Sequence, residues 1–166
     1  SLRRQAQLLS VRPDFQILQL RGNLDTRMKK LENGDFDAII LAGAGVKRLG
    51  WAEKITELLP VELSLPAIGQ GALGIETKTN DAYINGLVDF FNHPETSWCV
   101  RGERALLTRL EGGCQVPIAA YGSLSGETIR IDGLVASTDG KTILKDTISG
   151  HRADCEKLGV ELAERL

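Results

Sequence analysis

The stretch LEGGCQVPI, residues 110–118, stands where a predicted helix meets a predicted strand. Upstream, residues 96–110 carry apolar side chains at roughly helical spacing. The two glycines supply the left-handed conformations that end a helix. Downstream, residues 116–123 are typical of a strand, and Pro117 suits only its first residues or an edge. Cys114 is therefore expected on a short tether between two regular elements.

A cysteine in this position has two interpretations. Cysteine is among the most often buried residues and commonly packs as a small hydrophobic side chain. A thiol on a tether is also a candidate nucleophile for covalent chemistry. The spacing around Cys114 leaves both interpretations open.

Composition excludes several classes of protein. The chain has 166 residues, of which 42% are hydrophobic and 25% charged, as in ordinary globular proteins. A net charge of −2 argues against a general nucleic-acid binder. The apolar runs are too short for a membrane span, and no export signal is recognised.

The cysteines and histidines give no sign of a disulfide framework or a metal site. Cys99, Cys114 and Cys155 form no paired spacing, so reduced thiols and a cytoplasmic location are expected. His93 and His151 lie far apart without cysteine neighbours at ligand spacing, so no metal is expected.

The first part of the chain predicts a β-α-β unit. A short amphipathic helix starts at Leu2, with Ser1 as its N-cap. Residues 15–20 (FQILQL) alternate like a strand, residues 24–31 are helical, and residues 37–42 (DAIILA) are typical of a buried parallel strand. We expect a right-handed crossover. The abrupt opening without an initiator methionine favours the interior of a longer chain.

Arginines stand at two predicted helix starts. Arg3 and Arg4 follow Ser1, Arg21 follows a strand end, and Arg27 lies in the first turn of the next helix. Helix N-termini beyond strand ends bind anions, and arginine offers forked donors that match carboxylates. A single arginine of this kind is more often simply solvated. Their grouping favours an acidic ligand.

Two glycine-containing stretches invite comparison with nucleotide-binding loops. In residues 43–50 (GAGVKRLG) the third glycine of the dinucleotide pattern is replaced by Arg48. Residues 69–74 (GQGALG) match the letters, but the preceding strand is too short and residues 72–77 are typical of a strand rather than a helix. We instead interpret residues 66–71 as an interdomain hinge, where Gln70 offers an amide to a ligand.

The second part of the chain predicts a different architecture. A helix over residues 81–91 precedes the helix that leads to Leu110. Three strand-like runs follow, with Ser-Gly and Asp-Gly turn signals between them, and then a terminal helix. The runs are residues 116–123, 128–136 and 142–149, and the helix is residues 152–166. We expect an α+β domain, a three-stranded antiparallel sheet with helices on one face.

The sequence resembles the porphobilinogen deaminase family, also called hydroxymethylbilane synthases, over nearly its whole length. The motifs are SLRRQAQL, LRGNLDTRMKKLENGDFDAIILA, GAGVKRLG, LPAIGQGALGIE, ERALLTRLEGGCQVPI and GLVASTDG. The resemblance implies a transferase of tetrapyrrole (heme) biosynthesis, which deaminates four porphobilinogen molecules and joins them head to tail into hydroxymethylbilane. In the family the product grows on a dipyrromethane primer, which a thioether links to a cysteine.

The resemblance also implies roles for individual residues. Cys114 matches the attachment cysteine, so covalent dipyrromethane is the expected cofactor. Pyrrole acetates and propionates make the cofactor and the growing chain polyanions. The residues expected to bind cofactor carboxylates are Ser1, Arg3, Arg4, Arg21, Arg27 and Gln70, and those expected to bind porphobilinogen and the growing chain are Arg21, Arg27 and Arg48. Cys99 and Cys155 match no functional position, and a monomer is expected.

The family has three domains, which implies a division of this chain. Residues 1–65 match most of the second domain, an incomplete α/β domain of the periplasmic-binding-protein type. Residues 66–92 match a hinge and a returning strand and helix of the first domain, and residues 93–166 match the C-terminal α+β domain. The family's catalytic aspartate belongs to the preceding part, so no catalytic residue and no turnover are expected of this chain alone. The alternative is a small-anion binding module of the same architecture, which would have no use for Cys114.

Overall fold

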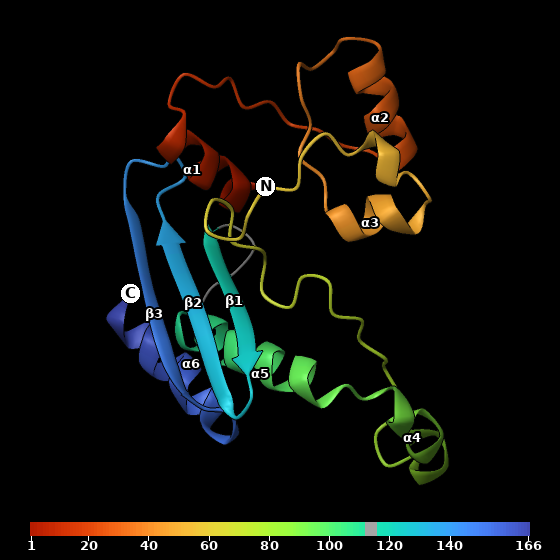
Figure 1. The fold of residues 1–166 in the computed structure, drawn as a ribbon, viewed down its shortest axis with the longest axis vertical. Helices are drawn as coiled ribbons and strands as arrows, with labels where there is room; N and C mark the ends of the chain where they lie inside the picture. The colour runs from red at the N-terminus through yellow and green to blue at the C-terminus, as the bar shows by residue number, and fades with distance from the viewer. Residues whose placement is uncertain (112–115) are drawn as a thin grey trace.

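The second half of the chain is built around one antiparallel sheet. The computed structural model describes residues 1–111 and 116–166. The sheet has three strands in the order β1 (Ile118–Ser125), β2 (Thr128–Ala136) and β3 (Ile143–His151) (Figure 1). Both connections are tight, with glycines at positive φ of 60° and 71° at positions 126 and 140. The predicted antiparallel sheet and its turns are confirmed.

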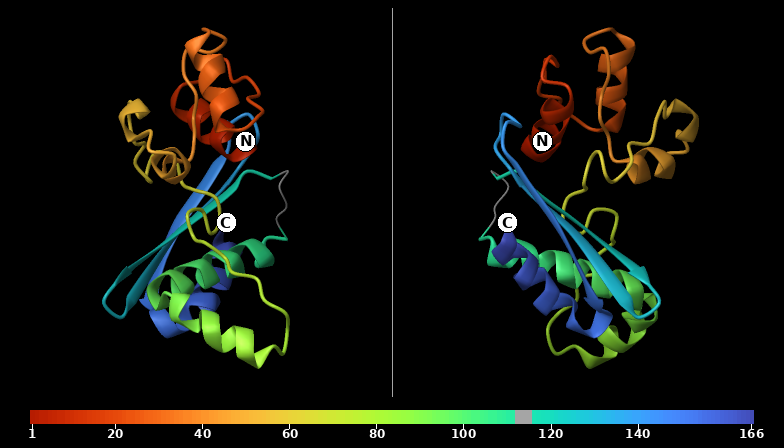
Figure 2. Two further views of the ribbon diagram at one scale, coloured as in Figure 1. Left: turned by 90° about the vertical axis from the view of Figure 1, so that its right-hand side faces the viewer. Right: turned by 60° about the vertical axis from the view of Figure 1, so that its left-hand side comes forward.

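Two helices cover one face of this sheet. α5 (Pro94–Arg109) and α6 (Cys155–Arg165) lie on the same side of it (Figure 2). His93 caps α5 by accepting from the Thr96 backbone N–H, and proline occupies the first helical turn. The fully buried side chains between helices and sheet include Leu106, Ile129, Ile131 and Leu162. A short 3-10 helix, Arg152–Asp154, leads into α6, so the predicted terminal helix is confirmed.

The helices that follow residue 93 lie on one face of the sheet as expected, and the opposite face is covered at one end by a helix from the first part of the chain. Helix α1 (Leu2–Val11) lies there, and a second buried cluster joins it to the sheet. The members of the cluster are Ala6, Leu65, Ala119, Leu134 and Ala136. Successive strand residues point to opposite faces. Because Ile118, Ala119 and Ala120 are all buried, this end of β1 has to be covered on both sides.

The remaining helices of the first part form a lobe beyond that end of the sheet. α2 (Leu24–Glu32) and α3 (Gly43–Arg48) lie there with a short 3-10 helix, Ala52–Lys54 (Figure 1). Asn23 caps α2, since its side-chain oxygen accepts from the Thr26 N–H at 2.9 Å. The helices predicted in this part are therefore present.

The predicted strands of the first part are wrong for this structure. Among the described residues, segments 15–20, 37–42 and 72–77 contain no strand. Their large apolar side chains include Phe15, Leu18 and Leu73, which are 41%, 63% and 87% exposed. Alternation reports which side chains favour burial, whereas a strand exists only through hydrogen bonds to a neighbouring strand. None of these segments has such a neighbour here, so no parallel β-α-β unit is formed.

Helix α4 (Ala82–Val88) lies on a separate arm (Figure 1). Asp81 caps it, as its carboxylate accepts from the Ile84 N–H at 3.0 Å, and a 3-10 turn, Asp89–Phe91, extends it. The helix predicted over residues 81–91 is confirmed. Within the described ranges, no helix has the length and apolar character that crossing a bilayer requires.

Candidate functional site

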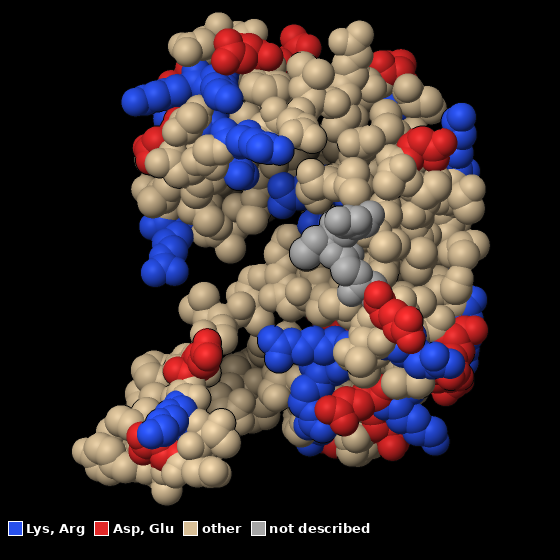
Figure 3. Space-filling model, turned by 180° about the vertical axis from the view of Figure 1, so that it is seen from behind, with Lys and Arg blue, Asp and Glu red and all other residues tan. Residues whose placement is uncertain are grey.

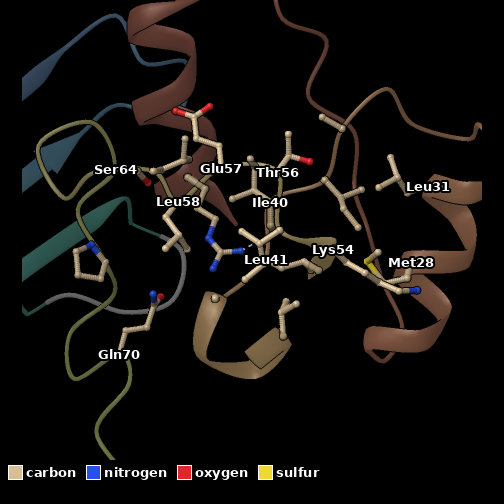
Figure 4. A pocket seen from close by; sticks show the side chains of 18 of the residues that line it. Met28, Leu31, Ile40, Leu41, Lys54, Thr56, Glu57, Leu58, Ser64 and Gln70 are labelled. Atoms are coloured by element: carbon tan, nitrogen blue, oxygen red, sulfur yellow. Dashed lines mark hydrogen bonds between the residues drawn. The ribbon is translucent and has the colours of Figure 1, made fainter. Parts of the chain in front are cut away.

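A cavity of about 500 Å³ lies between α1 and the lobe of α2 and α3. Figure 4 shows it, with Gln70 at one end and Met28 and Leu31 at the other. Apolar side chains such as Ile40 and Leu58 make up much of its wall. Cavities of this size that combine apolar walls with a few polar groups are typical of small-ligand sites.

Helix α1 presents Arg3 and Arg4 to this cavity. The Ser1 hydroxyl accepts from the Arg4 N–H at 3.4 Å, which fixes the start of the helix as predicted. The Arg3 guanidinium donates to the Leu65 carbonyl and, at 3.3 Å, to the Gln70 side-chain oxygen. The Arg4 guanidinium donates to the Ile40 carbonyl at 2.8 Å. Arg3 and Gln70, distant in sequence, are thus brought together.

The two arginines carry positive charge that no carboxylate of the described residues pairs with. Burial, and then the charge of Arg4, lowers the pKa of Arg3 to about 10. Burial, and then the charge of Arg27, lowers the pKa of Arg4. Within the described part of the chain, no ion pair joins either guanidinium to a carboxylate. Half-buried, unneutralised arginines favour a carboxylate or phosphate ligand.

The other predicted arginines lie outside the cavity wall. Arg27 donates to the Gly22 carbonyl at 2.8 Å, and it is close enough to Arg4 to lower the pKa of Arg4. Arg21 is exposed and donates to Gln19, and Arg48 is exposed at the end of α3. Seen from behind, Lys and Arg side chains gather on the lobe that borders a hollow in the molecule (Figure 3). The structure therefore groups Arg3, Arg4 and Gln70, with Arg27 nearby.

Cys114, the expected attachment residue, lies outside the described residues. On the described side, α5 ends at Arg109, and Glu111 adopts a left-handed φ of 51°. The left-handed turn therefore starts before the glycines that were predicted to supply it. Of the other cysteines, which match no functional position of the family, Cys155 is buried in the core and Cys99 packs against it. Burial is the main cause that raises the pKa of Cys99.

Two buried polar residues near the cavity were missed from the sequence. The Gln7 side-chain oxygen accepts from the Leu65 N–H at 2.7 Å, and its amide donates to the Leu65 carbonyl at 3.1 Å. The Glu103 carboxylate accepts from the Gly69 N–H at 2.6 Å and the Gly122 N–H at 2.8 Å. The sequence did hold a sign that Glu103 is buried. Its spacing from Cys99, Leu106 and Leu110 places a carboxylate on the apolar face of the predicted helix.

The glycine pattern at residues 69–74 is not a nucleotide-binding loop in this structure. No helix starts at these glycines, since the next one along the chain begins at Ala82. The dinucleotide fingerprint requires a helix N-terminus at the pyrophosphate. In the part of the chain that the structure describes, no three or more His, Cys, Asp or Glu side chains form a group that could hold a metal ion.

Two family models match consecutive parts of the chain. The one described as "Porphobilinogen deaminase, dipyromethane cofactor binding domain" matches residues 1–86. The one described as "Porphobilinogen deaminase, C-terminal domain" matches residues 97–166. The first model includes α1, Arg3, Arg4 and Gln70, and the second includes the sheet with α5 and α6.

Curated proteins similar to this chain bear the name that the two family models give, porphobilinogen deaminase. Porphobilinogen deaminases of Geobacter metallireducens, Geotalea daltonii and Geobacter sulfurreducens are 60%, 58% and 58% identical to this chain over all 166 residues. The match covers 100% of this chain but 52% of each of those proteins. The chain thus spans about half the length of the curated relatives it matches.

Proposed function

The chain belongs to the porphobilinogen deaminase family, and from this premise we propose that it is part of a transferase that joins four porphobilinogen molecules into hydroxymethylbilane with loss of ammonia. The observation that carries the proposal is the pair Arg3 and Arg4, two half-buried guanidinium groups that line one cavity without a carboxylate partner among the described residues. A substrate and a product that are both polycarboxylates match this site.

The residues present fit a dipyrromethane cofactor. Each of its pyrroles carries an acetate and a propionate, and Arg3 and Arg4 offer two separate guanidinium groups to such carboxylates. The apolar wall around Ile40 and Leu58 suits flat pyrrole rings, and the cavity volume of about 500 Å³ lies in the range of small-molecule sites. When bound, the dipyrromethane supplies the pyrrole end to which porphobilinogen is added.

We assign the individual residues as follows. Cys114 holds the cofactor through its sulfur, an assignment supported by the match of the LEGGCQVPI stretch to the family. Ser1, Arg3, Arg4, Arg21, Arg27 and Gln70 bind cofactor carboxylates, and Arg21, Arg27 and Arg48 bind the incoming porphobilinogen and the growing chain. The proximity of Arg27 to Arg4 supports a continuous positive surface from α1 to α2.

We propose that the chain works inside a longer protein. Residues 1–65 would form most of an α/β domain of the periplasmic-binding-protein type, residues 66–92 a hinge and a returning strand and helix, and residues 93–166 the C-terminal domain. The exposure of Phe15, Leu18 and Leu73 supports additional strands that cover them in that protein. We further propose a monomeric, cytoplasmic protein without nucleic-acid partners. We also propose that the catalytic carboxylate lies in another part of the longer protein, so that this chain alone does not turn over porphobilinogen.

The experiment is a turnover assay with the full-length protein and its Cys114→Ser variant. The proposal predicts that the unmodified protein consumes porphobilinogen and releases ammonia with hydroxymethylbilane as product, and that the variant does not. A protein that binds carboxylates but never consumes porphobilinogen would instead be a small-anion binding module, the alternative that the arginine pair by itself also favours.

A further inference from the structure

Residues 65–70 connect the core to the cavity and are held at both ends by buried polar side chains. At one end, Gln7 pairs with both the N–H and the carbonyl of Leu65, at 2.7 Å and 3.1 Å. At the other end, Glu103 accepts from the Gly69 N–H at 2.6 Å. Gln7 and Glu103 are only 3% and 5% exposed. Burying an amide or a carboxylate costs free energy unless the group is fully hydrogen-bonded. Two such side chains at the two ends of one segment therefore indicate that the position of the segment matters for function.

The Glu103 anchor ties the segment to the sheet. Its second oxygen accepts from the Gly122 N–H at 2.8 Å, and Gly122 belongs to β1, an edge strand of the sheet. A Cβ at Gly122 would meet the Cα and Cβ of Cys99 at 2.9 Å, so only glycine lets β1 approach α5 here. Gly69 has a φ of +68°, a left-handed conformation at the residue whose N–H meets Glu103.

Pro66 and Gln70 of this segment line the cavity. Gln70 follows Gly69 directly, and its side-chain oxygen accepts from Arg3 at 3.3 Å. The same Arg3 guanidinium donates to the Leu65 carbonyl, which Gln7 also holds. Arg3 is therefore bonded to both ends of the segment that the two anchors fix. Displacement of either end would move a hydrogen-bond acceptor of Arg3.

We propose that Gln7 and Glu103 are positioning residues, which hold the Leu65 and Gly69 backbone so that Arg3 and Gln70 meet the carboxylates of the bound ligand in a fixed arrangement. Neither side chain lines the cavity. The inference rests on the proposed function, because it specifies how that carboxylate site is held. A purely structural role would require only that both side chains satisfy buried backbone groups.

The test uses Glu103→Met and Gln7→Leu in the full-length protein. Both replacements keep a side chain of similar size but remove its hydrogen-bonding groups, which leaves backbone groups of Leu65, Gly69 and Gly122 without these partners and costs stability for each buried group left unpaired. Ile131→Val is the matched control, because Ile131 lies in the core that α5 covers and its aliphatic side chain cannot hydrogen-bond to residues 65–70. Each protein is assayed for porphobilinogen turnover and for amide hydrogen exchange over residues 65–71.

The proposal predicts that each variant lowers kcat for porphobilinogen turnover by about tenfold with a smaller change in KM, because Arg3 and Gln70 orient the attached cofactor rather than the incoming porphobilinogen, while Ile131→Val leaves kcat within about twofold. Exchange at residues 65–71 should accelerate in the two variants and not in the control. Folded variants with unchanged kcat and unchanged exchange would overturn the proposal. If the unmodified protein showed no turnover, the proposed function would fail, but the exchange result would still decide whether the two anchors hold the segment.

Discussion

Arg3 and Arg4 line the same cavity, and the charge of Arg4 adds to burial in lowering the pKa of Arg3 to about 10. Both guanidinium groups are bonded to backbone carbonyls, which are neutral acceptors. Because no carboxylate in residues 1–111 and 116–166 pairs with them, these two neighbouring cations raise the free energy of the ligand-free protein. A bound carboxylate removes this penalty, so the same pair that disfavours the empty site favours ligand binding.

Neutralising Arg3 should therefore weaken ligand binding without weakening the fold. In the full-length Cys114→Ser protein, whose site no attached cofactor occupies, we expect Arg3→Met to lower the affinity for citrate, a simple tricarboxylate probe, by about tenfold, because one charge-assisted contact is lost. The unfolding temperature should stay equal or rise, as repulsion with Arg4 disappears. Calorimetric titration and thermal unfolding measure the two effects. Arg101→Met is the control, since Arg101 is paired with Glu156 away from the cavity. A fall in unfolding temperature with unchanged citrate affinity would identify Arg3 as structural.

The pH dependence of binding follows from the lowered pKa of Arg3. The pKa of Arg3 in the folded protein is about 10, well below the ordinary value of a guanidinium, so between the two values the folded protein has lost a proton that the unfolded chain keeps. A carboxylate binds the charged form, so citrate affinity should fall as the pH rises through about 10. By the same linkage, the unfavourable contribution of Arg3 to stability is fully present below about pH 10 and is relieved above it. Titrations at several pH values should show this fall, and Arg3→Met should flatten it.

Replacing a helical glycine by alanine should have opposite effects on stability at two positions, Gly159 in α6, which packs against α5, and Gly86 in α4, which is open to solvent. A Cβ at Gly159 would meet the Gly102 carbonyl oxygen at 2.2 Å, and this oxygen belongs to a helix backbone that cannot give way. Gly159→Ala should therefore lower the free energy of unfolding by about 1–3 kcal/mol. At Gly86 in α4 a Cβ meets nothing within 4 Å, so Gly86→Ala should be neutral or stabilising by about 0.5–1 kcal/mol. Urea unfolding of both variants measures the two changes in the free energy of unfolding. An unchanged free energy of unfolding for Gly159→Ala would contradict the close approach of α5 and α6.

The C-terminal core and the irregular segments of the first part should differ in their protection from hydrogen exchange and proteolysis. Most of the buried core joins α5, α6 and the sheet, whereas segments 12–23 and 71–80 have mostly exposed side chains and no helix or strand. Hydrogen exchange of the 166-residue chain should be slowest in β2 and α5 and fastest in those two segments. Limited proteolysis should cut within them first and leave a resistant fragment that contains residues 94–166. Early cleavage inside the sheet would contradict this distribution of stability.

The sequence predicted the C-terminal part well because its contacts are local. The strand predicted over residues 128–136 coincides with β2, and both turns fall at the predicted dipeptides. Hairpins pair neighbours in sequence, so alternation and turn signals carry nearly all of the necessary information. The predicted strands at residues 15–20 and 37–42 failed because parallel strands need distant partners, which periodicity does not reveal.

The candidate site was predicted in part. The arginine-rich start of α1 and Gln70 were recognised from the sequence, and the structure places them on one cavity. Arg21 and Arg48, predicted with them, lie on the surface away from the cavity wall, and their roles stay predictions. Gln7 and Glu103 escaped notice because a polar residue in a helix ordinarily faces solvent, and only the fold brings their backbone partners within reach.

The central claim is that this chain carries a covalent dipyrromethane, and its most direct test is the intact mass of the full-length protein followed by peptide mapping of Cys114. The account predicts an added mass of two porphobilinogen units less their ammonia, located on Cys114, together with a positive reaction for pyrroles with an acidic aldehyde reagent. After unfolding, Cys99 and Cys155 should react with iodoacetamide, while Cys114 stays blocked by its thioether. A bare, alkylatable thiol at Cys114 in the full-length protein would contradict the account.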